Sequence, residues 1–349
     1  MNFQSWMMRG AGATLLLGGW LVACSSEAGD TDGAGDADGT SPDGANADGG
    51  PDAPSDGADG SDVDGDGVDG GGSGGSAAGP RGANCKRGLA YGGHSDADFA
   101  ALSPALSWWY NWYFEPDEAL RDGNYRSADV EYVPMYHSVK EAFDPDTMIE
   151  RIPSDSKMLL GFNEPNFHVQ ANLSAAAAAA AWPEVERIAD AHGLAIASPA
   201  VNYCGPAQDC WDTNPFDYLD DFFAACEGCR VDAIAFHIYV GCNAGGENHA
   251  QWLIDHVKNY EARFPEGTYP QKFLLTEFAC SDAANFAEQR AFLEDAVEYL
   301  EGNPRVARYG WFSGRFDGMQ FVDLYGADGQ LTELGVAYRD APQAENCKR

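Results

Sequence analysis

Two glutamates stand at the ends of apolar segments, where a carboxylate contributes nothing to a core. Glu164 lies in the motif GFNEPNF (161–167), and Glu277 lies in LLTEFAC (274–280). A pair of carboxyl groups can divide the cleavage of a bond between them. One, when protonated, donates a proton to a leaving oxygen, while the other, when ionised, attacks the carbon. Acetal linkages between sugars are broken in this way, with the two groups about 5–5.5 Å apart when configuration is retained.

The segments that must position these glutamates are predicted strands. Eight apolar segments are bounded by turn residues, and most are apolar throughout. Continuous apolar character is typical of parallel strands buried on both faces. The predicted strands are 87–92, 107–113, 131–137, 157–163, 194–200, 232–240, 272–279 and 308–313.

Helical patterns separate the later strands. They cover 173–193, 216–226, 248–264 and 284–300, and the first has Ser174 as an N-cap and Pro183 as an expected break or kink. Strands alternating with helices predict the α/β class, and eight such strands predict a (β/α)₈ TIM barrel. The alternative is an open doubly wound sheet, but neither a GxGxxG nor a Walker motif follows the first predicted strand.

In a barrel of this kind the active site lies at the carboxyl ends of the strands. Glu164 ends the fourth predicted strand and Glu277 lies near the end of the seventh. Aromatic residues follow several of the other strands, and their rings suit the apolar faces of sugars. The sequence therefore predicts that the two glutamates face each other across the barrel mouth as a glycosidase pair.

The motifs at these strand ends resemble those of glycoside hydrolase family 128, the β-1,3-glucanases of clan A. Besides the two glutamate motifs, the resemblance is carried by SWWYNWYF (107–114), EYVPMYH (131–137), DAIAFHIY (232–239) and RYGWF (308–312). It implies a retaining endo-β-1,3-glucanase acting by double displacement on a glucan polysaccharide or oligosaccharide, without cofactor or metal. It also implies that Glu164 is the general acid/base and Glu277 the nucleophile.

The resemblance implies substrate-binding roles as well. Asn163 would bind the sugar 2-hydroxyl, Tyr239 would hold Glu277, and His237 would line the subsite or orient a carboxylate. Asn111 is the nearest substitute for a strand-two Arg that many clan A enzymes have. The stacking candidates are Trp108, Trp109, Trp112, Tyr136 and Trp311, although adjacent side chains alternate and one of the first two is expected in the core.

The N-terminal part of the chain predicts export. Residues 1–24 resemble a lipoprotein signal peptide, with Cys24 as the lipidated residue, and the alternative is an ordinary signal peptide. Residues 25–83 form a predicted disordered spacer. It contains 14 acidic residues, and its first basic residue is Arg81. DVDGDGVDG (62–70) imitates the start of a calcium loop without its final Glu. We expect a lipid anchor at the cell surface, on the outer membrane if the organism has one, and a hydrolase domain over 84–347.

Eight cysteines remain after Cys24, an even number that favours disulfides in an exported chain. Cys85 and Cys347 stand at the two ends of the predicted domain, where a bridge would tie the termini together. Cys226 and Cys229 also form half of a zinc motif, but no second half accompanies them. The remaining pairing is not determined by the sequence.

Charge limits the choice of partner. The net charge is −34, and residues 81–349 alone hold 41 acidic and 20 basic residues. Such a surface argues against nucleic acid and favours a neutral ligand. We expect a monomer that meets the membrane only through its anchor. Two alternatives stay open: a glucan-binding surface lipoprotein with the same fold and little turnover, and a structural or metal-dependent surface protein organised by Cys and His.

Overall fold

The computed structural model describes residues 85–242, 248–270 and 272–347. The predicted signal peptide, the lipidation site Cys24, the acidic spacer and its calcium-like segment lie outside the described residues. Among the described helices, none combines the length and the apolar character that a membrane span requires.

Each of the eight segments predicted as strands contains a strand, and the ladders between them are parallel. The prediction of a parallel α/β fold is therefore confirmed. The strands are β1 (Arg87–Ala90), β2 (Trp108–Tyr110), β3 (Glu131–Tyr132), β4 (Met158–Leu159), β5 (Ala195–Ile196), β6 (Ala233–Val240), β7 (Lys272–Cys280) and β8 (Val306–Phe312).

Strands β3, β4 and β5 are only two residues long, much shorter than predicted. Pro134 follows β3 and Pro199 follows β5, and a proline has no N–H to give to a ladder. After β4, Gly161 lies so close to the next strand that a Cβ there would be 2.9 Å from the Ala197 carbonyl oxygen. These residues limit regular pairing to the first part of each segment.

The strands pair in two sheets. The larger has the order β3-β2-β1-β8-β7-β6, and the smaller consists of β4 and β5. Single parallel bridges continue beyond both sheets: Met135 pairs with Leu160, and Ala197 pairs with Ala233. The β4–β5 pair is thus bridged to the β3 edge and to the β6 edge of the larger sheet.

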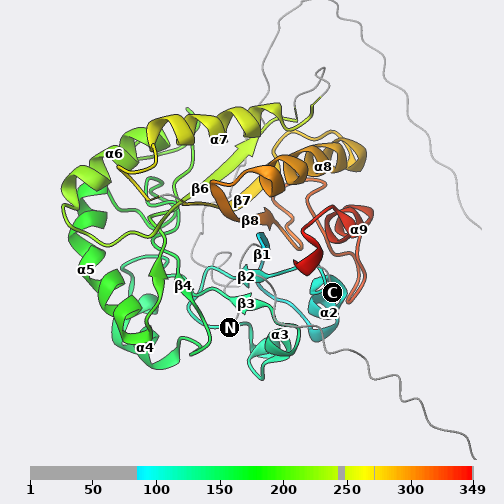
Figure 1. The fold of residues 1–349 in the computed structure, drawn as a ribbon, viewed down its shortest axis with the longest axis horizontal. Coiled ribbons are helices and arrows are strands. Elements are labelled where there is room, and N and C mark those ends of the chain that lie inside the picture. The colour runs from blue at the N-terminus through cyan, green and yellow to red at the C-terminus, as the bar shows by residue number, and fades with distance from the viewer. Residues whose placement is uncertain (1–84, 243–247, 271, 348–349) are drawn as a thin grey trace, which may run out of the picture. The chain divides into compact units, whose positions relative to one another are not determined.

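Helices lie outside the strands and follow one another around them in chain order (Figure 1). In α5 the Ser174 side chain accepts from the Ala177 N–H, as the sequence predicted, and the helix continues through Pro183. The helices are α2 (Asp96–Leu102), α3 (Asn124–Ser127), α4 (Pro145–Arg151), α5 (Ala175–His192), α6 (Pro215–Ala225), α7 (Gln251–Arg263), α8 (Phe286–Gly302) and α9 (Glu333–Asp340), with 3₁₀ turns at Glu118–Leu120, Glu141–Phe143 and Glu345–Cys347.

Side chains of the strands divide between two apolar clusters. Trp109 belongs to the larger cluster, which includes residues of the surrounding helices, whereas its neighbours Trp108 and Tyr110 belong to a smaller cluster formed by strand residues and the segments that follow them. Because successive strand residues point to opposite faces, this division explains why the strands are apolar throughout.

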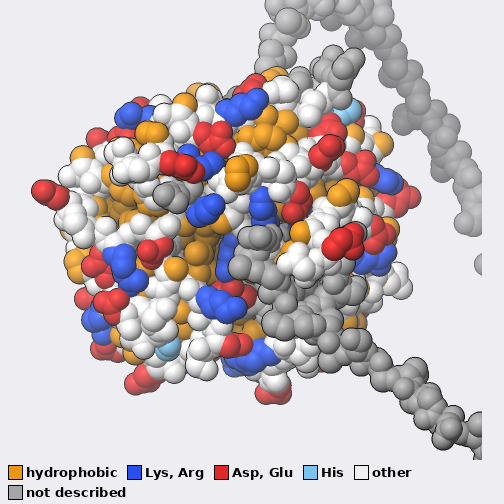
Figure 2. All heavy atoms as spheres, in the orientation of Figure 1, with side chains coloured by type: hydrophobic (Ala, Val, Ile, Leu, Met, Phe, Trp, Pro, Cys, Tyr) orange, Lys and Arg blue, Asp and Glu red, His pale blue; other side chains and the backbone are white. Residues whose placement is uncertain are grey.

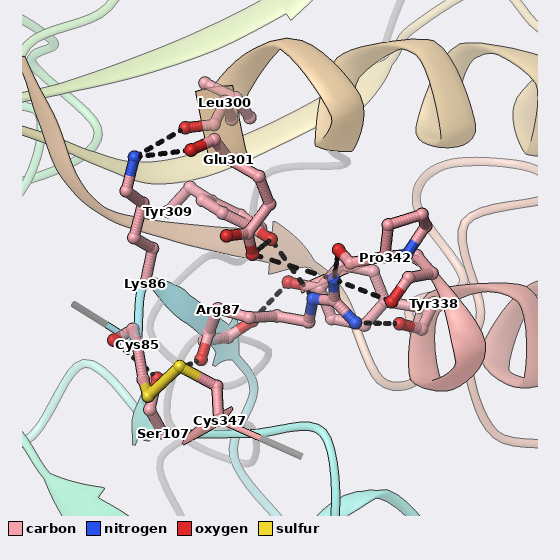
Figure 3. Close-up of polar contacts among 12 residues, drawn as sticks. Cys85, Lys86, Arg87, Ser107, Leu300, Glu301, Tyr309, Tyr338, Pro342 and Cys347 are labelled. Atoms are coloured by element: carbon pink, nitrogen blue, oxygen red, sulfur yellow. Dashed lines mark hydrogen bonds and ion pairs between the residues drawn. A yellow bond between two sulfur atoms is a disulfide. The ribbon is translucent and has the colours of Figure 1, made fainter. Parts of the chain in front are cut away.

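Arg87 anchors β1 to the end of the described chain (Figure 3). Its buried guanidinium donates to the Tyr309 hydroxyl at 3.1 Å and to the carbonyls of Tyr338 and Pro342 at 2.8 and 2.7 Å. The neighbouring Lys86 ammonium donates to three carbonyls at the C-terminus of α8. A buried cation is stable only with such complete hydrogen bonding.

All eight cysteines of the domain form disulfides, so the prediction of disulfides over zinc is confirmed. The bridge between Cys85 and Cys347 ties the ends of the domain together, as the sequence suggested. The four pairs are Cys85–Cys347, Cys204–Cys210, Cys226–Cys229 and Cys242–Cys280.

Loss of the terminal disulfide is expected to destabilise the domain strongly. Cys85 and Cys347 are 262 residues apart in sequence, so replacing both with Ser should lower the free energy of unfolding by about 4–5 kcal/mol. The matched control replaces Cys226 and Cys229, whose separation is 3 residues, and should cost only about 1–2 kcal/mol. Urea denaturation followed by circular dichroism measures both, and equal losses would contradict the loop-entropy explanation.

His94 is a buried base inside an aromatic cage. Its ring meets Tyr91, Trp109 and Tyr325 edge-on, and neither ring nitrogen has a hydrogen-bond partner among the described residues. Burial lowers the pKa of His94 to about 3. The folded protein therefore holds this imidazole neutral at pH values where an exposed histidine is protonated.

This burial predicts a defined loss of stability in acid. The unfolded chain takes up a proton at His94 below about pH 6.5, but the folded chain does not until about pH 3, so stability falls with pH between these values. The variant His94→Phe should lose about 2 kcal/mol less than the wild type between about pH 7 and pH 5. Denaturant titrations at the two pH values test this, and parallel losses in both proteins would contradict it.

Candidate active site

Glu164 and Glu277 come together at the carboxyl ends of their strands. Glu277 lies within β7, paired across to His237 of β6, and Glu164 follows β4 after four residues. One oxygen of each carboxylate and one ring nitrogen of His237 all lie within 4.8 Å of one another. The two glutamate side chains are largely buried, with 8% and 4% of their residue surface exposed.

Three donors fix Glu277, one from β2, one from the segment directly after β2 and one from β6. The Tyr110 hydroxyl and the Trp112 indole N–H donate to Oε1 at 2.8 and 2.7 Å, and the Tyr239 hydroxyl donates to Oε2 at 2.5 Å. Each oxygen therefore accepts at least one hydrogen bond. Donors aimed at a carboxylate stabilise its negative charge and hold it in one orientation.

Glu164 has a different environment. Its Oε1 accepts from the Asn202 amide at 3.1 Å and lies 2.9 Å from His237 Nδ1, whereas no hydrogen bond reaches its Oε2 from the described residues. Its backbone has φ +37°, in the left-handed region that a non-glycine residue adopts only at a cost. Strain of this kind is concentrated at sites where the position of a side chain matters more than stability.

His237 lies between the two carboxylates. Its Nδ1 is 2.9 Å from Glu164 Oε1 and 3.3 Å from Glu277 Oε2. Burial of the ring opposes protonation, but the negative charge of Glu277 and the hydrogen bond to Glu164 outweigh it, and the pKa of His237 is raised. The proton on Nδ1 is therefore held between two acceptors.

The tyrosines stay protonated. Burial, together with the charge of Glu277, raises the pKa of both Tyr110 and Tyr239 well above the ordinary value of tyrosine. Their hydroxyl groups consequently remain hydrogen-bond donors to the carboxylate at pH values where an exposed tyrosine begins to ionise.

The donor set fits a metal poorly. Glu164, His237 and Glu277 are close enough together to bind one ion, but both oxygens of Glu277 already accept hydrogen bonds from protein donors, which a cation would displace. Cys242, Cys280 and Asp282 form a second close group, but its two sulfurs are joined in a disulfide and are not thiolates.

Four of the predicted site residues lie at or beside this pair. Trp112, His237 and Tyr239 contact one of the two carboxylates directly. Asn163 precedes Glu164 and is buried; its amide N–H donates to Gln170 at 3.3 Å, and its Oδ1 has no partner among the described residues.

The other five predicted residues are not brought to the carboxylates. Trp109 and Trp311 have no exposed surface and pack in the larger cluster, and Tyr136 packs there against Phe162. Trp108 donates to the Lys86 carbonyl, toward the start of β1. Asn111 bonds to the Glu115 carbonyl, Asp117 and Tyr132. Burial among protein atoms leaves these side chains no free face for a sugar.

Two residues that contact the pair were not predicted. Tyr110 lies between the predicted Trp109 and Trp112, and strand alternation would have found it once the inward side of β2 was known. Asn202 follows β5 and reaches Glu164 through a loop. Its only sequence signal is a polar residue directly after the apolar segment that ends in Val201.

Comparison with families and curated proteins places the chain among carbohydrate-active enzymes. A model described as the glycosyl hydrolase catalytic core matches residues 88–338. The chain is also 26% identical over 270 residues to alkali-sensitive linkage protein 1 of Schizosaccharomyces pombe (strain 972 / ATCC 24843). That match covers 72% of this chain and 44% of the yeast protein, so the chain spans less than half of that relative.

Solved structures with a similar fold are enzymes of glycoside hydrolase family 128. The subgroup II endo-β-1,3-glucanase of Sorangium cellulosum is 56% identical, with 74% of this chain and 99% of that one covered and a TM-score of 0.70. The subgroup II endo-β-1,3-glucanase of Pseudomonas viridiflava is 30% identical, with coverage of 75% and 99% and a TM-score of 0.63. The subgroup III curdlan-specific exo-β-1,3-glucanase of Blastomyces gilchristii, solved with glucose, is 28% identical, with coverage of 74% and 99% and a TM-score of 0.57.

Proposed function

Because the chain belongs to glycoside hydrolase family 128, we propose that this glycoside hydrolase is a retaining endo-β-1,3-glucanase. In this proposal Glu277 is the nucleophile and Glu164 the general acid/base. The observation that carries it is the close approach of the two carboxylates, each with an oxygen within 4.8 Å of the other. The fold proposed around them is a closed (β/α)₈ barrel, supported by the bridges at both edges of the larger sheet.

The separation of the two carboxylates supports hydrolysis with retention of the anomeric configuration. A retaining enzyme needs its carboxylates about 5–5.5 Å apart, so that one can attack the anomeric carbon directly, whereas an inverting enzyme needs about 6.5–9.5 Å to admit a water molecule between carboxylate and sugar. The nearest oxygens of Glu164 and Glu277 lie within 4.8 Å of each other, which is closer to the spacing of retaining enzymes than to that of inverting ones. We therefore assign double displacement.

The hydrogen bonds support the division of roles. Glu277 accepts from three donors that stabilise a carboxylate ion and aim it, as a nucleophile requires. Glu164 has an oxygen to which no described residue donates, and this oxygen is available to hold a proton for the leaving group. His237 Nδ1 lies within 3.3 Å of an oxygen of each carboxylate, and the nearby Glu277 charge contributes to its raised pKa.

The reaction proceeds in two steps. An oxygen of Glu277 forms a bond to the anomeric carbon as the glycosidic C–O bond breaks, and the Glu164 proton passes to the leaving oxygen. Glu164, now ionised, removes a proton from water as that water attacks the anomeric carbon and the bond to Glu277 breaks. The buried, unpartnered Oδ1 of Asn163 is the acceptor proposed for the sugar 2-hydroxyl.

Reducing-sugar release from laminarin and curdlan by residues 81–349 tests the function. Release of oligosaccharides from both is the expected result, with products of mixed length that distinguish endo action from the exo action of the Blastomyces enzyme. Binding of both glucans without release would instead favour the glucan-binding lipoprotein. Release that stops on addition of a chelator would favour a metal-dependent surface protein.

Tyr239 is proposed to position the nucleophile. Tyr239→Phe removes a hydrogen bond of 2.5 Å and should lower kcat about tenfold to a hundredfold, because a small displacement of the attacking oxygen is costly. The matched control is Tyr260→Phe, since the buried Tyr260 hydroxyl has no hydrogen-bond partner among the described residues; its kcat should be that of the wild type. Similar losses in both variants would show a general effect of removing a buried hydroxyl.

Export and lipid anchoring are part of the proposal. Disulfides persist in oxidising compartments outside the cytosol, and the domain has four. Labelling of the full chain with a palmitate analogue, abolished by Cys24→Ala, is the expected result. Equal labelling of both proteins would exclude Cys24 as the lipidated residue.

A further inference from the structure

Trp211 is a large apolar side chain on the surface, with 52% of its area exposed. It lies in the loop between β5 and α6, the same loop that brings Asn202 to Glu164. An exposed tryptophan gives up the stabilisation that its burial would provide. By itself such exposure is common, so the significance of Trp211 depends on how it is held and on what surrounds it.

The ring of Trp211 is held in one place. Its indole N–H donates to Asn172 Oδ1 at 3.0 Å, and its backbone N–H donates to the Asn166 carbonyl at 2.8 Å. Asn172 has φ +56°, a left-handed conformation that costs free energy. The adjacent Cys210 is bridged to Cys204. The loop thus fixes an exposed aromatic ring that contributes little to the core.

A hollow of about 500 Å³ lies beside this ring, separate from the catalytic carboxylates. Asp212 and Asp221 border it, and neither side chain has a hydrogen bond or an ion pair within the described part of the chain. The rest of the wall consists of small residues at the start of α5 and the end of α6: Ser174, Ala175, Ala176, Ala224 and Ala225. We call Trp211, Asp212 and Asp221 the Trp211 platform.

The chemistry of the Trp211 platform suits a neutral sugar. An aromatic face packs against the C–H face of a pyranose, and the carboxylate oxygens accept hydrogen bonds from hydroxyl groups. The two carboxylates disfavour an anionic ligand, and among the described residues no Lys or Arg lines the hollow. Acidic and basic side chains are interspersed elsewhere, as the face in Figure 2 shows.

We propose that the Trp211 platform is a second binding site for β-1,3-glucan, distinct from the subsites at Glu164 and Glu277. This inference rests on the proposed function for the identity of the sugar. Trp211 lies in the same loop as Asn202, which reaches Glu164, and its backbone N–H bonds to the carbonyl of Asn166, two residues after Glu164. A polymer bound at Trp211 is therefore held near the catalytic pair, and its effective concentration there rises. We expect the gain to be larger for long or insoluble chains, which can occupy both sites at once, than for short oligosaccharides.

The test compares Trp211→Ala with Trp252→Ala in the full chain. Trp252 is a matched control because it is 48% exposed and lies on α7. Affinity for curdlan is measured by depletion from solution, with Glu277→Gln added to each protein to prevent hydrolysis, and activity is measured on curdlan and on laminarihexaose. Trp211→Ala should weaken curdlan binding about tenfold and reduce activity on curdlan much more than activity on laminarihexaose, while Trp252→Ala changes neither.

Each other outcome has a definite meaning. Unchanged curdlan binding by Trp211→Ala overturns the second site, provided that the wild type cleaves curdlan. Equal losses on curdlan and laminarihexaose also overturn it, because they would place Trp211 within the catalytic subsites. A wild type that cleaves neither substrate would refute the proposed function itself, and the two failures are therefore distinguishable.

Discussion

Glu277→Gln is expected to lower kcat on laminarin by about 10⁴-fold or more. The amide keeps the shape of the side chain but cannot form the covalent bond to the anomeric carbon. Tyr110, Trp112 and Tyr239 all donate to this one carboxylate. Glu277 therefore accepts more hydrogen bonds than Glu164 does. Initial rates of reducing-sugar release measure the effect.

The matched control is Glu131→Gln. Glu131 is also a partly buried carboxylate of a strand, but it pairs with Arg308 at 2.6 Å near the beginning of β3. The kcat of this variant should stay within about twofold of the wild type, since Glu131 is the first residue of β3 whereas Glu277 lies near the carboxyl end of β7. A Glu277→Gln enzyme that retained more than about a tenth of wild-type activity would contradict the nucleophile assignment.

Glu164→Gln should lower kcat on laminarin by about 10²–10⁴-fold, because the leaving oxygen no longer receives a proton. The loss should be far smaller on an aryl β-glucoside whose phenol leaves readily without protonation. Comparing the two substrates separates proton donation from a structural role, which would reduce both rates equally. Equal losses would therefore refute Glu164 as the general acid.

The strands and the positions of the two glutamates at strand ends were predictable because their causes are local. Apolar segments bounded by turn residues define the strands, and each glutamate is a polar interruption at the end of such a segment. Trp108 and Trp109 were both stacking candidates, with one of them expected in the core. Trp109 lies in the larger cluster, but two adjacent tryptophans give no information about which of them points inward. Tyr110, which does point inward, contacts Glu277.

Residues that are positioned by tertiary contacts could not be predicted from the sequence. Asn202 reaches Glu164 because the ends of β4 and β5 are paired through Asn163 and Ala200, a proximity that no local pattern encodes. The same holds for Cys242 and Cys280, which join the ends of β6 and β7. The short β3 and β5 show the opposite limit, since Pro134 and Pro199 were visible in the sequence but the apolar character of these segments led to longer predicted strands.

The most direct test of the account is the configuration of the first product. Proton NMR during the first minutes of laminarin hydrolysis distinguishes the anomers before mutarotation equilibrates them. Because an oxygen of Glu164 and an oxygen of Glu277 lie within 4.8 Å of each other, we predict that the β-anomer appears first. Initial release of the α-anomer would show inversion and contradict the double-displacement mechanism.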